Sequence, residues 1–174
     1  MNQKVAMATR IVLALGTAAY FFYYAQTPMD WHFIDNVNLI IHEAGHSIFA
    51  FFGDFLHILG GSLLQIAIPV IFSGYFFLRG QYYSGSLLLF WVGQNFINVS
   101  VYAADAVVMQ LPLLGGDNAG HDWNNLLSMT HALPYTHAIA TALFTAGFVT
   151  MCAAAALSLY FGCVSPAEKR RASY

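Results

Sequence analysis

The chain has 174 residues, of which 59% are hydrophobic and 8% are charged, and its mean hydropathy is +0.60. Because a soluble domain carries roughly a quarter of charged residues, this composition excludes an ordinary soluble protein and predicts one integral membrane domain over residues 1–174. The net charge of −2 provides no basic surface for nucleic acid, so we expect no nucleic-acid partner.

Five stretches are long and apolar enough to cross a bilayer, which takes about 20 residues in a helix. They predict an all-α, polytopic transmembrane bundle with spans at about 7–25, 28–52, 61–78, 85–110 and 134–161. The first ends in bulky "YFFYYAQ", a poor signal-peptide cleavage site, so we expect an uncleaved helix. In an up-down bundle the second and fourth spans run parallel. The positive-inside rule then favours a cytoplasmic C-terminus.

The second span begins near "TPMD", which carries several helix-start signals. Thr27 is expected as the N-cap, Pro28 at the first helical position and Asp30 in the first turn. These signals predict a helix that runs from Pro28 to Phe52, before Gly53.

This span contains His42-Glu43-Ala44-Gly45-His46, an H-E-x-x-H motif in an otherwise apolar run. Residues four apart lie on one helix face, so both imidazoles can bind one metal ion, and Glu43 can take a proton from metal-bound water. Zinc lowers the pKa of such water toward about 7. Ionisable groups inside a membrane are costly and mark functional sites. The alternative is a pair of buried histidines that hydrogen-bond to neighbouring helices.

Two polar stripes accompany the motif, one on the second span and one on the fourth. Their members are Asp35, Asn38, His42 and His46, and Asn95, Asn98, Tyr102 and Asp105. Polar stripes in lipid must face each other or a wet cavity. We expect Asn95 and Asn98 to form interhelical hydrogen bonds or to position a substrate, and Asp105 to be paired or metal-bound. Gly45 lets another helix backbone approach the motif.

The long connection at 111–133 is expected to be functional. A catalytic zinc site commonly has three protein ligands, so a third must come from outside the motif. His121 and Asp105 rank equally, with Asp122 and Asp117 behind them. Asp122 is alternatively a partner that orients an imidazole, or the N-cap of a short helix in "DWNNLLSM". The remaining histidines are expected at the membrane interface: His32, His57, His131 and His137.

The motif on a membrane helix resembles the intramembrane zinc metalloproteases of the site-2 protease class. The resemblance implies that His42 and His46 are zinc ligands, that Glu43 is the catalytic base and that Asp105 is the aspartate ligand. Asp105 stands in "YAADA", without the Asn-Pro that precedes the aspartate in that family. The stretches "LGGSLLQ", "GQNFINVSVYAADA", "LPLLGG" and "HDWNNLL" also resemble small bacterial membrane proteins of unassigned function. That resemblance implies a shared site of His42, Glu43 and His46 with Asp105, His121 and Asp122, without implying a reaction. We expect a multi-pass protein of the bacterial inner membrane.

Three functions follow from these residues. The first is a zinc-dependent intramembrane hydrolase, most simply a metallopeptidase acting on a membrane-embedded peptide through metal-activated water. The second is a zinc hydrolase that acts on a lipid amide or ester. The third is a non-enzymatic metal-binding membrane protein. Glu43 discriminates between them, because hydrolysis needs a base and metal binding alone does not.

Overall fold

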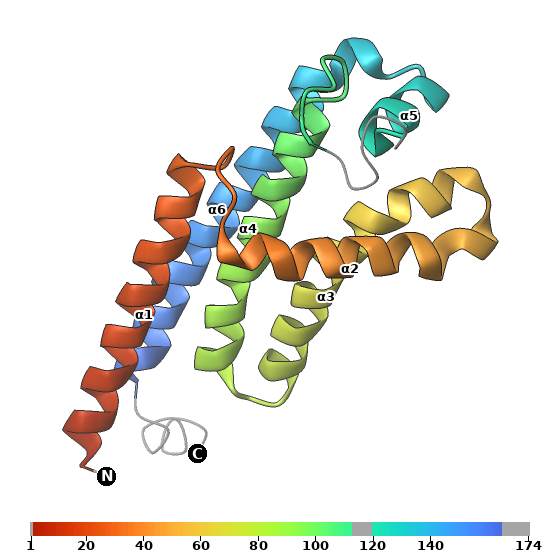
Figure 1. Cartoon of the computed structure of the whole chain (residues 1–174). Coiled ribbons are helices and arrows are strands. Elements are labelled where there is room, and N and C mark those ends of the chain that lie inside the picture. The colour runs from red at the N-terminus through yellow and green to blue at the C-terminus, as the bar shows by residue number, and fades with distance from the viewer. Residues whose placement is uncertain (1, 113–119, 165–174) are drawn as a thin grey trace.

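The computed structural model describes residues 2–112 and 120–164, and within these ranges all the regular elements are helices (Figure 1). The all-α prediction is therefore confirmed. The elements, in chain order, are α1 (Gln3–Gln26), α2 (Phe33–Phe49), η1 (Ala50–Phe52), α3 (Asp54–Leu78), α4 (Tyr82–Ala104), α5 (Asp122–Met129), η3 (Leu133–Tyr135) and α6 (Thr136–Cys163).

Four helical stretches are long and apolar enough to cross a membrane: Gln3–Gln26, Asp54–Leu78, Tyr82–Ala104 and Leu133–Cys163. This indicates a membrane protein. Helix α2 has 17 residues and is not among these four stretches. Figure 1 shows α2 running across α4, and not alongside it as the sequence predicted for the second and fourth spans.

Helix α2 begins at Phe33, later than the start signals predicted. Thr27 instead ends α1, and the Asp30 N–H donates to the Thr27 carbonyl at 3.0 Å to close a turn. Proline at the second position suits such a turn as well as it suits the first position of a helix, which explains the difference. The N–H of His32 then donates to Asp35 Oδ2 at 2.8 Å, which caps the true start of α2.

Helix α3 begins at Asp54, before the predicted start at about 61, and it bends between its two halves in Figure 1. It contains Pro69, which has no N–H to donate to the carbonyl of Gln65 four residues earlier. Proline is the commonest cause of such a bend. The first half of α3 consequently packs along α2, and the second half descends beside α4.

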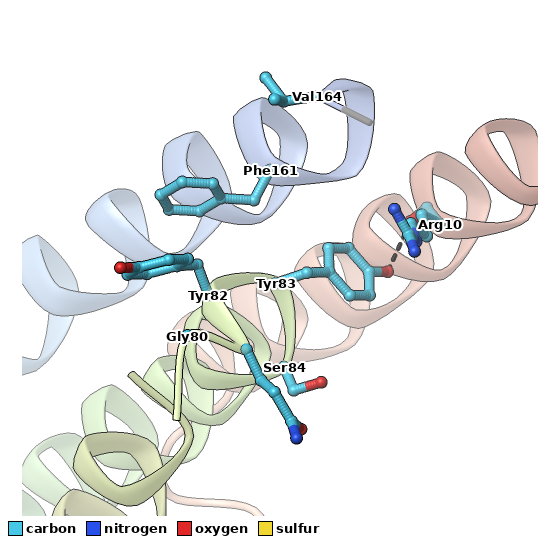
Figure 2. A pocket seen from close by; sticks show the side chains of 8 residues that line it. Arg10, Gly80, Tyr82, Tyr83, Ser84, Phe161 and Val164 are labelled. Atoms are coloured by element: carbon cyan, nitrogen blue, oxygen red, sulfur yellow. Dashed lines mark hydrogen bonds between the residues drawn. The ribbon is translucent and has the colours of Figure 1, made fainter. Parts of the chain in front are cut away.

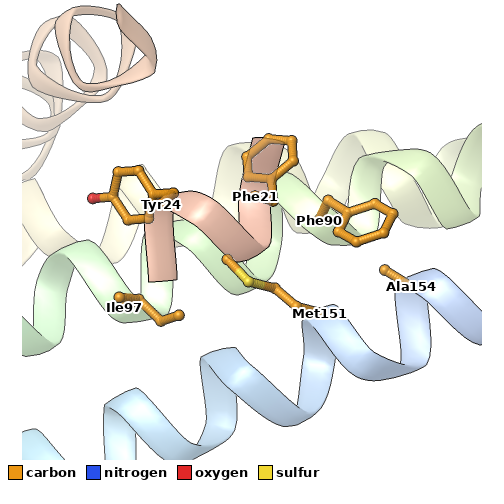
Figure 3. Packing of buried hydrophobic residues seen from close by; sticks show 6 residues of the cluster. All are labelled: Phe21, Tyr24, Phe90, Ile97, Met151 and Ala154. Atoms are coloured by element: carbon orange, nitrogen blue, oxygen red, sulfur yellow. The ribbon is translucent and has the colours of Figure 1, made fainter. Parts of the chain in front are cut away.

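The apolar core lies where α1, α4 and α6 meet (Figure 3). The rings of Phe21 and Phe90 are stacked with centroids 5.7 Å apart. Two residues from each helix form the buried cluster: Phe21, Tyr24, Phe90, Ile97, Met151 and Ala154. Helix α4 is the most buried of the four candidate spans, so it forms the centre against which the other helices pack.

Glycines bring α4 and α6 into backbone contact. A Cβ on Gly93 would lie 2.6 Å from the carbonyl oxygen of Gly147, and a Cβ on Gly147 would lie 2.5 Å from that of Gly93. Small residues allow this approach between helices in membranes, where tight van der Waals packing drives association.

We predict that Gly93→Ala destabilises the protein by about 1–3 kcal/mol, because the added methyl group must push α4 away from α6. Thermal unfolding in detergent measures this as a lower melting temperature. Gly74→Ala is the matched control, since a Cβ there meets nothing within 4 Å. Equal melting temperatures for the two variants would contradict the packing argument.

Candidate metal centre

The inward face of α2 carries the polar residues predicted from their spacing. Asp35, Asn38 and His42 are buried, and His46 is half-buried one turn further along. Gly45 on the same face meets the backbone of Gly60, so α2 and α3 are in close contact, as the sequence predicted. The two motif histidines therefore face α3, with their rings 4.8 Å apart between centroids.

His42, His46 and Asp122 form a cluster whose ligand atoms all lie within 4.8 Å of one another. The Oδ2 atom of Asp122 is 2.9 Å from Nε2 of His42 and 3.2 Å from Nε2 of His46. Two imidazole nitrogens and one carboxylate oxygen are ligands that zinc accepts, and three protein ligands leave a position open, as in catalytic zinc sites.

Both imidazoles donate from the nitrogen that faces away from Asp122. Nδ1 of His42 is 3.0 Å from Gln65 Oε1, and Nδ1 of His46 is 2.9 Å from the backbone carbonyl of His57. Because oxygen acceptors of this kind cannot donate, each Nδ1 carries the hydrogen. In a neutral ring, Nε2 then carries a lone pair and no hydrogen, and the lone pairs of both rings point at one carboxylate oxygen of Asp122.

That arrangement requires positive charge among the three groups. Without an ion, an imidazole must carry a second hydrogen, on Nε2, to donate to Asp122. Burial raises the pKa of the Asp122 carboxyl, but hydrogen bonds from such imidazolium rings outweigh it and lower the pKa to about 2, so Asp122 is an anion. Two protonated imidazoles would place two like charges side by side against one carboxylate. A divalent cation between two neutral imidazoles and the carboxylate avoids this repulsion, so the residues fit a metal ion.

His121 and Asp105, the two third-ligand candidates ranked first from the sequence, pair with each other. His121 Nε2 lies 3.2 Å from Asp105 Oδ2. Nδ1 of His121 accepts from the N–H of Asn124 at 3.2 Å, which makes His121 the N-cap of α5 in place of the predicted Asp122. Asp117, the remaining candidate, lies outside the described residues.

This pair holds the chain that carries Asp122. The Asp105 carboxylate accepts from the backbone N–H groups of Gln110 and Leu111, each at 2.9 Å, which fixes the segment after α4. The N–H of Asp122 donates to Tyr102 Oη at 3.0 Å. Asp105 thus has hydrogen-bond partners, as its cost in apolar surroundings requires.

Helix α5 is docked onto the bundle by two further side chains. Trp123 Nε1 donates to Ser62 Oγ of α3 at 3.2 Å, and Asn124 Nδ2 donates to the carbonyl of Ala106 at 2.8 Å. These two hydrogen bonds hold α5 against α3 and against the segment that follows α4. They set the position of Asp122, which adjoins Trp123.

Glu43 and the α4 asparagines occupy different environments. Glu43 is exposed and follows His42 directly on α2. Asn98 forms interhelical hydrogen bonds, as predicted, to Tyr24 and other buried groups. For Asn95 the predicted interhelical hydrogen bond is wrong, because its Nδ2 donates to the carbonyl of Trp91 within α4 and its buried Oδ1 has no partner among the described residues.

Gly61 was not singled out from the sequence, yet it borders the cluster. A Cβ on Gly61 would lie 2.5 Å from Nε2 of His42 and 2.7 Å from Nε2 of His46. Gln65 was also missed, although a single amide in the apolar stretch "LLQIAIP" signals a buried polar partner. His57 contributes its carbonyl to the site, and its exposed ring lies 5.7 Å from that of His46.

A cavity of about 280 Å³ lies at the other end of α4, bordered by Arg10, Tyr83 and Val164 among others (Figure 2). Tyr83 Oη donates to the Arg10 carbonyl there at 2.7 Å. None of its lining residues belongs to the histidine cluster, so the cavity adds no group to the candidate metal centre.

No family model, curated protein or solved structure matches this chain. The interpretation of the site therefore depends on its geometry and chemistry.

We predict that Asp122→Asn lowers zinc affinity by at least about 100-fold, as His46→Ala does, because each removes a ligand. Asp105→Asn removes only a partner of His121. We expect zinc affinity to fall by about 10- to 100-fold in this variant, the loss typical of groups that surround the ligands of a metal site. Competition with a chelating dye measures affinity, and mass spectrometry of the purified protein measures metal content. Full zinc occupancy in Asp122→Asn would exclude Asp122 as a ligand.

We predict that Gly61→Ala abolishes zinc binding without unfolding the protein. The three atoms nearest to the new methyl group would belong to the two imidazoles, which can turn aside, and their Nε2 atoms would then no longer point at one ion. Gly16→Ala is the control, since a Cβ at Gly16 meets nothing within 4 Å. Metal content and melting temperature are measured together, and a zinc-loaded Gly61→Ala variant would contradict the prediction.

Proposed function

We propose that this protein is a zinc-dependent hydrolase of the membrane, most simply a metallopeptidase. The observation that supports the proposal is the convergence of two imidazole Nε2 lone pairs and the Asp122 carboxylate, with both Nδ1 hydrogens bound elsewhere. Such pre-oriented neutral imidazoles are what a zinc site needs, because the hydrogen bond at the far nitrogen fixes the ligating tautomer.

His42, His46 and Asp122 would hold the ion. Bound zinc supplies a Lewis acid that polarises a carbonyl and makes hydroxide available near neutral pH. Glu43 would act as the base that accepts a proton from water and delivers it to the leaving amine, a role that an exposed carboxylate beside the ligands can fill. Gly61 has no side chain, and any other residue at this position would crowd the ring nitrogens that face the ion.

The proposed site would resemble that of the site-2 protease class, with one difference. Two histidines and a glutamate would come from one helix and an aspartate would be the third ligand, but that aspartate would be Asp122 on the short helix α5. Asp105, which the resemblance implied, would instead hold that segment through His121. We propose a multi-pass protein of the bacterial inner membrane whose substrate is a membrane-embedded peptide.

We predict that Glu43→Gln keeps bound zinc and loses hydrolysis by at least about 100-fold, since general base catalysis contributes about 10²–10⁴-fold. The assay uses purified protein in detergent with fluorescein-labelled casein for peptide bonds and a fluorescent N-acyl amide lipid for lipid bonds. Glu43 is exposed, so its substitution should not disturb folding.

Cleavage of casein alone supports the peptidase, and cleavage of the lipid alone supports the lipid hydrolase. Equal hydrolysis by Glu43→Gln and the unmodified protein would rule out the H-E-x-x-H mechanism. Zinc binding with neither substrate cleaved would favour a metal-binding protein without hydrolase activity.

A further inference from the structure

The carboxylate of Asp35 lies at the start of α2, two turns before His42, and is 3% exposed. Hydrogen-bond donors surround it, among them Tyr24 Oη at 3.2 Å from Oδ1, and a shell of donors favours the ionised form although burial raises the pKa of this carboxyl. Oδ2 accepts from the N–H of His32, and Oδ1 accepts from Gln94 Nε2 at 3.0 Å and from Asn98 Nδ2 at 3.2 Å. Because an ionised carboxylate only accepts, both amides must turn their NH₂ groups toward it.

The orientation of Asn98 passes along a chain of amides to the candidate metal centre. With Nδ2 on Asp35, the Oδ1 of Asn98 faces Gln65 and accepts from its Nε2 at 2.7 Å. The Oε1 of Gln65 then faces His42 and accepts from Nδ1 at 3.0 Å. Each amide has a donor at one end and an acceptor at the other, so the direction set at Asp35 dictates the direction at His42.

A neutral group at position 35 would allow the chain to run the other way. Asn98 and Gln65 could both turn over, and Gln65 would then donate to Nδ1 of His42. The hydrogen of His42 would move to Nε2, where it would point at Asp122 Oδ2 and occupy the lone pair that a metal ion needs. The negative charge of Asp35 excludes this reversed chain.

We propose that Asp35 is a positioning residue that selects the metal-binding tautomer of His42 through Asn98 and Gln65. The proposal rests on the metal centre described above and names a group that controls it from outside the ligand set. Asp35 does not touch the cluster itself. Its influence crosses from α2 to α4 and α3 and returns to α2.

The test is Asp35→Asn in the full-length protein in detergent. The ¹⁵N NMR shifts of ¹⁵N-histidine-labelled, metal-free protein report which nitrogen of His42 is protonated, at a pH where the ring is neutral. We expect Nδ1–H in the unmodified protein and Nε2–H in the variant. Zinc affinity, measured by competition with a chelating dye, should fall by about 10- to 100-fold.

Tyr24→Phe is the matched control, because Tyr24 Oη donates to the same carboxylate at 3.2 Å but lies outside the chain of amides to His42. It should change neither the tautomer nor the zinc affinity. Adding Gln65→Glu to Asp35→Asn should restore both, since a carboxylate at position 65 only accepts from Nδ1 and again fixes the hydrogen there. A merely structural role for Asp35 predicts no such rescue.

An unchanged His42 tautomer in Asp35→Asn overturns the proposal, as does a double variant that fails to restore it. Asn98→Leu, which breaks the route between Asp35 and Gln65 but keeps the acceptor beside His42, tests the same route if Asp35→Asn does not fold. Because the tautomer is read in metal-free protein, a lack of hydrolysis or of zinc binding in the unmodified chain would overturn the proposed function and leave this test decisive.

Discussion

The structure depends on one constraint: every polar group that α2 brings into an apolar bundle must find a partner there. Asn38 shows how this fixes the helix. Its Nδ2 donates to Gln94 Oε1 at 2.8 Å, and its Oδ1 accepts from Trp91 Nε1 at 2.9 Å. Both partners lie on α4, so these bonds anchor α2 where it crosses the bundle. The histidines further along α2 are carried to α3 by the same anchoring.

The sequence allowed the helical class and the motif to be predicted, because length, apolarity and four-residue spacing are local properties. It did not predict the direction of α2, since the 3.6-residue period identifies the buried face but not the angle at which a helix crosses its neighbours. The predicted start of α2 at Pro28 was wrong for a related reason. A threonine and a proline, Thr27 and Pro28, suit a turn and a helix start equally well.

The third member of the cluster was harder to identify. His121 and Asp122 are adjacent, and side chains one residue apart at a helix start point about 100° away from each other. Which one faces the motif depends on which one caps α5, and that is decided by the distant Asp105. Chemistry alone favoured His121 as a ligand, but tertiary contacts assign it to capping. The contribution of Gly61 is visible only when α3 packs against α2.

The position of Asp122 on α5 has a thermodynamic consequence. The cluster takes two members from α2 and one from a short helix held by a few side-chain hydrogen bonds, so it is complete only when α5 is docked. The free energy of docking α5 is therefore one component of the affinity for a metal ion. Linkage is reciprocal: if undocking of α5 lowers the affinity for the ion by some factor, the bound ion shifts the docking equilibrium of α5 toward the docked state by the same factor. Ordering of this part of the chain and metal occupancy form a single linked equilibrium.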